Sequence, residues 1–141
     1  MTEFKNSAVK LMVVMRKAFR TIDAKVSESY KEDNLTATQF AALDVLYAKG
    51  EMTIGELIDK MLATSGNMTV VIKNMEKKGW VSRRLNPEDR RAYLVDLTSL
   101  GRRVIERALP AHIEKVEAVF SLLSENEQEE LIALLKKFKD L

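Results

Sequence analysis

Four arginines near the middle of the chain are the residues best suited to bind anions. They are Arg83, Arg84, Arg90 and Arg91, which fall within nine residues around the turn sequence NPED. A guanidinium forms two parallel hydrogen bonds with a phosphate, and the narrow minor groove of A·T-rich DNA attracts it. Asp89 can accept the hydrogen bonds of Arg91 in fork geometry and fix its direction. We therefore interpret Arg91 as a minor-groove contact, and Arg84 and Arg90 as phosphate contacts. The alternative is an ordinary solvated hairpin tip.

A second candidate set lies upstream, on one side of a predicted helix. It comprises short polar residues, one valine and two lysines: Ser65, Asn67, Thr69, Val70, Lys73 and Lys77. Compact hydrogen-bonding groups at the start of a helix suit base edges in a major groove, and lysines further along suit phosphates. The alternative is the solvated face that any amphipathic surface helix carries.

The elements that hold both sets follow one another as helix, turn, helix and two strands. The second helix is predicted from an apolar stripe at helical spacing, made up of Met68, Val71, Ile72 and Met75. Ser65 stands at its N-cap position and Gly79 at a left-handed C-cap position. A shorter helix precedes it over TIGELIDKM, and short strands follow over Val81–Leu85 and Ala92–Leu97. This order predicts a winged helix-turn-helix, an arrangement suited to double-stranded DNA.

The distribution of charge agrees with DNA contact, although the net charge is only +2. Residues 65–91 hold seven basic and three acidic residues, a net charge of +4. Residues 1–64 are neutral overall and residues 92–141 have a net charge of −2. The positive excess is therefore confined to the predicted DNA-contacting segment.

Three motifs in this segment resemble the MarR family of bacterial winged-helix regulators. They are EKKGWV over residues 76–81, R-x-x-x-x-D-x-R over 84–91 and LVDLTSLG over 94–101. The resemblance implies a homodimer whose recognition helices enter successive major grooves of double-stranded DNA, with wing arginines in the adjoining minor grooves. The family often carries Arg just after the helix's Thr, where this chain has Val70. Val70 is suited to an apolar contact such as a thymine methyl, not to guanine.

Amphipathic helices flank the winged segment. One is predicted from Asn6 to Lys31, and two lie beyond residue 98, the last with an apolar stripe over Leu131, Leu134, Leu135, Phe138 and Leu141. We predict a mainly α-helical chain with a winged helix-turn-helix DNA-binding domain over 35–98. Residues 1–34 and 99–141 are predicted to form a helical dimerisation region.

Capping patterns mark several helix boundaries. Capping boxes are predicted for Thr36 with Gln39, Thr53 with Glu56, and Ser124 with Glu127. Thr98 is expected to cap the helix that begins at Ser99, and Met52 to lie in a short strand beside the wing. Pro110 predicts a kink or a break near Arg107–Pro110 because an interior proline removes a backbone hydrogen bond.

Composition argues against several other classes of protein. The chain has one histidine and no cysteine, so thiol chemistry is excluded and a metal centre or catalytic site is not expected. It carries no phosphate-binding or dinucleotide-binding glycine motif, so no cofactor is expected. The N-terminal sequence lacks the apolar core of a signal peptide, and no run approaches the ~18 apolar residues of a membrane span. We expect a cytoplasmic protein that is not an enzyme.

These patterns lead to a hypothesis of regulation by occupancy of DNA, most simply repression at a roughly palindromic operator. Relatives in the resembled family commonly bind phenolic or other aromatic anions, which implies an effector that releases DNA. By that resemblance, an effector crevice here would include Met12, Arg16, Phe40 and His112, with ordinary packing as the alternative for each. A winged-helix module that binds proteins without specific DNA binding remains the alternative function.

Overall fold

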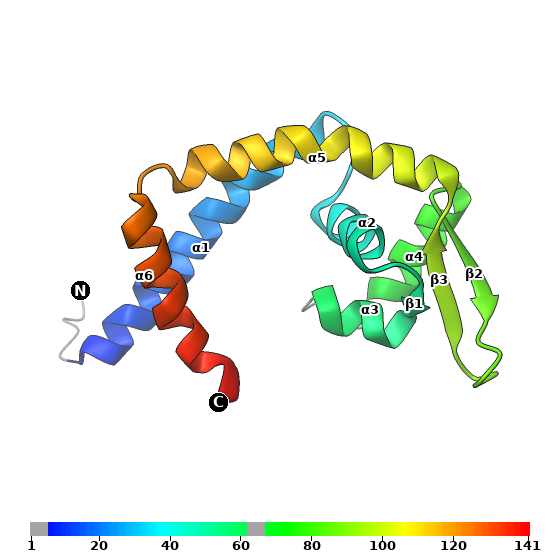
Figure 1. The fold of residues 1–141 in the computed structure, drawn as a ribbon, viewed down its shortest axis with the longest axis horizontal. Helices are drawn as coiled ribbons and strands as arrows, with labels where there is room; N and C mark the ends of the chain where they lie inside the picture. The colour runs from blue at the N-terminus through cyan, green and yellow to red at the C-terminus, as the bar shows by residue number, and fades with distance from the viewer. Residues whose placement is uncertain (1–5, 62–66) are drawn as a thin grey trace. The chain divides into compact units, whose positions relative to one another are not determined.

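The computed structural model describes residues 6–61 and 67–141 and is mainly helical, as predicted (Figure 1). The elements follow one another as α1 (Ser7–Lys31), α2 (Ala37–Lys49), β1 (Met52–Thr53), α3 (Ile54–Met61), α4 (Met68–Lys77), β2 (Val81–Leu85), β3 (Tyr93–Leu97), α5 (Ser99–Phe120) and α6 (Glu125–Lys136), with a final 3₁₀ turn over Lys137–Asp140. The predicted winged helix-turn-helix is confirmed by the order α3, α4, β2 and β3.

The described residues divide into two compact units. One comprises Met1–Ser29 and Ala111–Leu141, and the other comprises Tyr30–Pro110. The second unit thus takes in residues 30–34 and 99–110, which the sequence pattern assigned to the helical region. Tyr30, Ile105 and Ala108 explain this difference because their side chains are buried in the core of the winged unit.

The wing is part of a three-stranded antiparallel sheet in the order β1-β3-β2. Val81 of β2 lies opposite Leu97, and Leu85 lies opposite Tyr93. Met52 lies opposite Val95, which confirms the predicted short strand beside the wing. The sheet therefore ties the wing to the residues immediately before α3.

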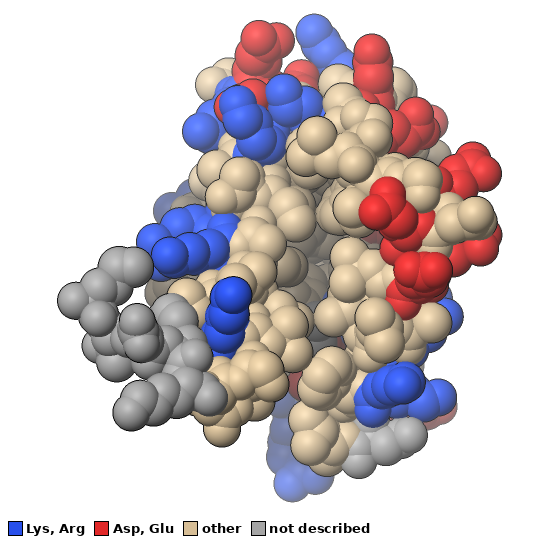
Figure 2. Space-filling model, turned by 90° about the vertical axis from the view of Figure 1, so that its left-hand side faces the viewer, with Lys and Arg blue, Asp and Glu red and all other residues tan. Residues whose placement is uncertain are grey.

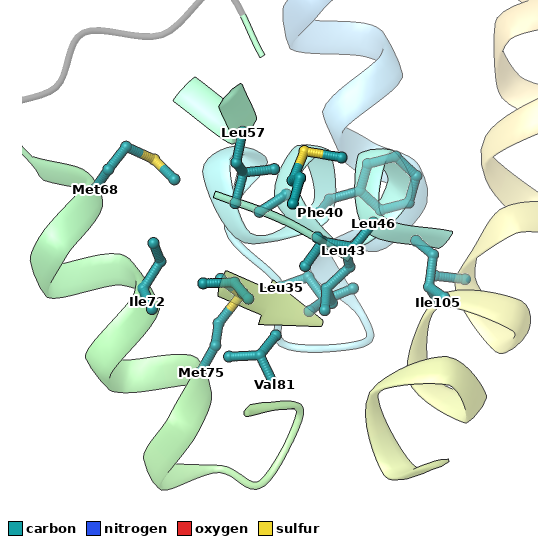
Figure 3. Packing of buried hydrophobic residues seen from close by; sticks show 14 of the residues in the cluster. Leu35, Phe40, Leu43, Leu46, Leu57, Met68, Ile72, Met75, Val81 and Ile105 are labelled. Carbon is teal, nitrogen blue, oxygen red and sulfur yellow. The ribbon is translucent and has the colours of Figure 1, made fainter. Parts of the chain in front are cut away.

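The core of the winged unit joins α2, α3, α4, the sheet and the first half of α5 (Figure 3). Its fully buried side chains include Leu43, Leu46, Leu57, Met68, Ile72, Met75, Val95 and Ile105. Three of these, Met68, Ile72 and Met75, belong to the stripe predicted for the second helix, and Val71 packs partly against them. Burial of this stripe turns the opposite face of α4 toward solvent.

Local capping explains where the helices begin and end. The capping boxes Thr36–Gln39 and Ser124–Glu127 are both formed, as predicted. At Thr53 the hydroxyl accepts the Glu56 backbone N–H, but the Glu56 carboxylate accepts from the Thr53 hydroxyl, so the expected reciprocal bond to the backbone is replaced. The N-cap predicted at Ser65 lies outside the described residues.

The C-terminus of α4 ends in the predicted left-handed glycine. Gly79 has φ +77°, and its N–H donates to the Glu76 carbonyl. The N–H of Trp80 donates to the Met75 carbonyl, so the two bonds form a Schellman motif. The chain then turns directly into β2.

The break predicted at Pro110 was wrong, because α5 continues from Ser99 to Phe120 with Pro110 inside it. Proline removes one hydrogen bond, but the helix is held on both sides of it. On one side Ile105 and Ala108 are buried in the core, and on the other the Lys115 ammonium lies 3.0 Å from the Glu28 carboxylate of α1. The alternative prediction of a kink stays a prediction.

The junction between the wing and α5 is unusually close. The Thr98 hydroxyl donates to the Gly79 carbonyl and accepts the N–H of Gly101, which confirms Thr98 as the cap of α5. A Cβ atom added at Gly101 would overlap the backbone carbonyl of Trp80. Only glycine therefore allows α5 to approach the start of β2 this closely.

We predict that Gly101→Ala lowers the free energy of unfolding by about 1–3 kcal/mol, the usual cost of forcing an extra methyl group into a packed site. Denaturant unfolding followed by circular dichroism measures this. Gly55→Ala is the matched control, because its nearest non-neighbouring atom is the Thr53 hydroxyl at 3.9 Å. It should leave stability unchanged or raise it by up to about 1 kcal/mol. Equal effects of the two substitutions would contradict the close-packing explanation.

Candidate nucleic-acid interface

The outward face of α4 carries the predicted base- and phosphate-contacting residues. Asn67, Thr69, Lys73 and Lys77 are all exposed. Val70 lies among them and is 58% exposed, an apolar side chain directed away from the core. The structure therefore brings together every described member of this set on one face of one helix, while Ser65 lies outside the described residues.

The tip of the wing holds Asp89, Arg90 and Arg91 in a turn between β2 and β3. One Asp89 oxygen accepts both the backbone N–H of Arg91, at 3.1 Å, and its Nε, at 3.2 Å. The two parallel bonds of the expected fork are not formed, because both bonds end on the same carboxylate oxygen. The Arg91 side chain is 93% exposed. Within the side chain only Nε is bonded to Asp89, so the two terminal nitrogens of the guanidinium face solvent.

Arg84 has a partner that local sequence patterns did not suggest. Its Nε and Nη2 donate to the two carboxylate oxygens of Glu51, at 2.9 and 2.8 Å. This is the fork geometry of a bidentate pair. Glu51 is 33 residues away in the chain. It approaches Arg84 only because β1 joins the same sheet, so the pair could be predicted only from the strand order.

The paired charges also change each other's protonation. The hydrogen bond from Arg84 lowers the pKa of Glu51 below its ordinary value, and the attraction of the guanidinium adds to this. The hydrogen bond to Glu51 in turn raises the pKa of Arg84. Both groups are therefore charged throughout the neutral range.

Arg83 is also held within the protein. Its Nε lies 2.7 Å from a carboxylate oxygen of Glu76 on α4, and its guanidinium lies 5.1 Å from the centre of the Tyr93 ring. Arg83 thus links the recognition helix to both strands of the wing. Of the four wing arginines, Arg83 and Arg84 have protein partners from other elements, and only the two at the tip point into solvent.

The remaining cations lie along α4 and at the wing tip. Lys73, Lys77 and Arg90 are exposed, and among the described residues they form no ion pair. The Lys78 ammonium lies 4.6 Å from the centre of the Trp80 ring. Lys73, Lys77 and Arg90 are therefore the side chains that an approaching phosphate would meet without first displacing a protein carboxylate.

The residues predicted for an effector crevice are distributed over both units. Met12 and Arg16 line a shallow hollow on α1 together with Met15, Phe19, Arg20 and Asp23. Phe40 is buried in the core of the winged unit, where its ring stacks on Tyr30 at a centroid distance of 4.6 Å. His112 is half-buried on α5. The structure thus gathers Met12 and Arg16 on one helix face and packs Phe40 elsewhere.

Comparison with known proteins identifies the family. YkoM, an uncharacterised HTH-type transcriptional regulator of Bacillus subtilis, is 34% identical over 130 residues, which cover 92% of this chain and 84% of YkoM. MhqR, an HTH-type transcriptional regulator of the same organism, is 32% identical over 130 residues, covering 92% of this chain and 90% of MhqR. The MarR family profile matches residues 35–93. The chain belongs to the MarR family.

Solved MarR structures share the whole fold. A mutant of MarR from E. coli in complex with operator DNA has a TM-score of 0.87 and 26% identity, and the alignment covers 98% of this chain and 99% of that chain. Members of the MarR family are transcriptional regulators and not enzymes, which agrees with the sequence-based prediction. In the parts of the chain that are described, no helix is long and apolar enough to cross a membrane.

We predict that the Glu51–Arg84 pair of this MarR-family chain breaks only in acid. Because folding lowers the pKa of Glu51, the pair stabilises the fold above the ordinary glutamate pKa of about 4.3, and that contribution is lost as the pH falls through the lowered pKa. A carboxyl-detected NMR titration of Glu51 measures the midpoint. In Arg84→Gln the midpoint should rise toward the ordinary value; identical midpoints in both proteins would disprove the pairing.

Proposed function

We propose that this protein is a dimeric regulator that binds a specific, roughly palindromic operator in double-stranded DNA and represses transcription by occupying it. The observation that carries the proposal is the exposed polar and cationic face of α4 beside the arginine-bearing wing tip. The MarR–operator complex, whose fold this chain shares, supports the proposal. Such a regulator would act in the bacterial cytoplasm, where the DNA is.

Each described side chain of this interface has a role that its position favours. The N-terminal end of a recognition helix is the part that meets base edges. At this end of α4 lie Asn67, Thr69 and Val70, and we add Ser65 to this group. Lys73, Lys77 and Arg90 are placed for phosphates. Arg91, oriented by Asp89, is placed for the minor groove.

The dimer is proposed from apolar surface that the described residues of one chain leave exposed. Among the described residues, Tyr30 is the only buried residue of α1, and α6 buries none. Exposed apolar side chains on these helices and on the final 3₁₀ turn include Leu11, Met12, Met15, Phe19, Leu131, Leu134, Leu135 and Phe138. Figure 2 shows an uncharged surface in the middle of the face that it draws, with basic and acidic side chains around it. A second copy would bury such a surface.

We predict that the wild-type protein sediments with twice the chain mass of 16.1 kDa. Leu134→Lys, which puts a charge on an apolar side chain of α6 that is 56% exposed, should shift it toward the monomer. Leu85→Lys on β2 is the matched control, because Leu85 is 51% exposed but lies in the winged unit. Sedimentation velocity over a concentration series measures both. A monomeric wild type, or equal effects of the two substitutions, would contradict the proposed interface.

The general test is a selection of genomic DNA with purified protein, followed by titration of the enriched site at two salt concentrations. We expect a two-fold-symmetric site with half-sites about 10 base pairs apart and binding that weakens steeply as salt rises. Weak binding to all DNA without enrichment would refute the operator proposal and favour a protein-interaction module.

Two substitutions separate the roles of the wing and the helix. Arg91→Ala should weaken binding about tenfold at operators with A·T-rich flanks and much less at G·C-rich flanks. The reason is that the substitution removes the guanidinium that the narrow minor groove of A·T-rich DNA attracts. Lys77→Ala should weaken binding evenly and reduce the slope of log K against log salt by about 0.9 per subunit. Fluorescence anisotropy with paired operators measures both. If neither variant differs from wild type, the proposed orientation on DNA is wrong.

Val70 should select a thymine in the operator. Its exposed methyl groups can contact the 5-methyl group of thymine in the major groove. Replacing the contacted thymine by deoxyuridine, which lacks only that methyl group, should cost about 0.8 kcal/mol, or a fewfold loss of affinity. The same exchange of thymine for deoxyuridine should leave the affinity of the Val70→Ala variant unchanged. Wild-type binding that is indifferent to deoxyuridine at every thymine would exclude this contact.

We further propose an aromatic or phenolic anion as the effector that releases DNA. The support is the hollow on α1, whose lining includes the apolar side chains of Met12 and Phe19 as well as the positive charges of Arg16 and Arg20. A ligand releases DNA only if it binds the non-DNA geometry more tightly. Calorimetric titration of phenolic acids that gives no heat and no loss of operator binding would refute the effector proposal.

A further inference from the structure

The Glu51–Arg84 pair spans the whole width of the sheet. Glu51 immediately precedes β1, Arg84 lies in β2, and β3 runs between those two strands. Thr53 of β1 and Arg84 of β2 both lie opposite Leu94, so the two outer strands flank the same β3 residue. The pair therefore connects the two outer strands across the middle one.

This connection supplements a short strand pairing. β1 meets β3 through only two residue pairs, and α3 begins at the residue that follows β1. A two-stranded hairpin has little stability by itself, so the direction of the wing depends on what holds its base. The two bonds at 2.8 and 2.9 Å fix both the distance and the plane of the Arg84 guanidinium relative to the start of α3.

The same bonds change what Arg84 can offer to DNA. Its side chain is 58% exposed, so its position on the surface alone suggests a phosphate contact. However, the carboxylate of Glu51 neutralises it, and a phosphate would have to displace a bidentate partner. Lys73, Lys77 and Arg90 present no such obstacle within the described part of the chain.

We propose that Glu51 is a positioning residue of the DNA interface: its bidentate pair with Arg84 anchors the wing to the segment before α3 and withholds Arg84 from DNA phosphates. The proposal rests on the DNA-binding function proposed above. It assigns Arg84 to orienting the wing tip, and Arg91 with it, where the sequence pattern suggested a phosphate contact.

The salt dependence of operator binding tests this assignment. Wild type, Glu51→Gln, Arg84→Gln and the double variant are compared by anisotropy at several salt concentrations, after circular dichroism has confirmed that each is folded. Arg84→Gln should leave the slope of log K against log salt unchanged, because Arg84 contacts no phosphate. Glu51→Gln should steepen the slope by about 0.9 per subunit, because it frees Arg84 to bind one. The double variant should return to the wild-type slope.

A second readout separates positioning from charge. All three variants should lose part of the preference for A·T-rich over G·C-rich flanks, because each removes the Glu51–Arg84 pair that is proposed to orient the wing. Exchanging the two charges in Glu51→Arg with Arg84→Glu rebuilds the pair and should restore the preference. Glu88→Gln is the matched control. It removes the same charge from the exposed wing turn, and among the described residues Glu88 itself forms no ion pair, so it should change neither slope nor preference.

The outcomes are distinguishable. A shallower slope in Arg84→Gln, with no change in Glu51→Gln, would overturn the inference and make Arg84 a phosphate contact whose pair opens on DNA. Failure of the charge exchange to restore flank preference would overturn the positioning role. A wild-type protein with no specific, salt-sensitive binding would refute the DNA-binding proposal itself, before any variant is compared.

Discussion

The contact between the start of α5 and the backbone of Trp80 is the constraint on which the winged unit depends. Within that contact, Gly79 ends α4, Trp80 leads into β2, Thr98 ends β3 and Gly101 lies in the first turn of α5. Four elements thus meet through a few backbone hydrogen bonds, two bonds of the Thr98 hydroxyl and one missing Cβ atom. The end of α4 is joined to the base of the wing here, so the proposed contacts of helix and wing with DNA depend on this junction.

The wing illustrates why counting charges overestimates the cations available to DNA. Residues 65–91 have a net charge of +4. That figure omits Glu51, which lies outside the segment in sequence but is bonded to Arg84 in space. It does include Glu76, but it does not show that this carboxylate is paired with Arg83. The basic residues therefore divide into a set that fixes the geometry of the wing and a set that remains available for phosphates. Exposed ion pairs usually add little stability, so orientation is the more plausible benefit of the first set.

Interactions between residues close together in the sequence could be predicted, and interactions between residues far apart in the sequence could not. The capping boxes at Thr36 and Ser124, the glycine at the end of α4 and the apolar stripe of α4 depend on neighbours within a few residues, and these are confirmed. At Thr53 only half of the predicted capping box is formed. The pairs Arg84–Glu51 and Arg83–Glu76 depend on strand order and on the packing of α4 against the sheet, which no local pattern contains. The break predicted at Pro110 was wrong for a related reason: propensity favours a break there, but buried and ion-paired residues on both sides keep the helix continuous.

Apolar periodicity alone could not distinguish a core from an interface. The stripes of α4 and α6 look alike in sequence, yet the α4 stripe is buried and the α6 stripe lies open. Helices gain most of their stability from packing of an apolar face, and the described residues leave much of the apolar face of α1 and α6 exposed. If the partner that covers this face is a second copy, its two-fold symmetry doubles every contact made by α4 and the wing. The modest net charge of +2 is then sufficient, because affinity would come from two precisely spaced sets of local cations and not from overall basicity.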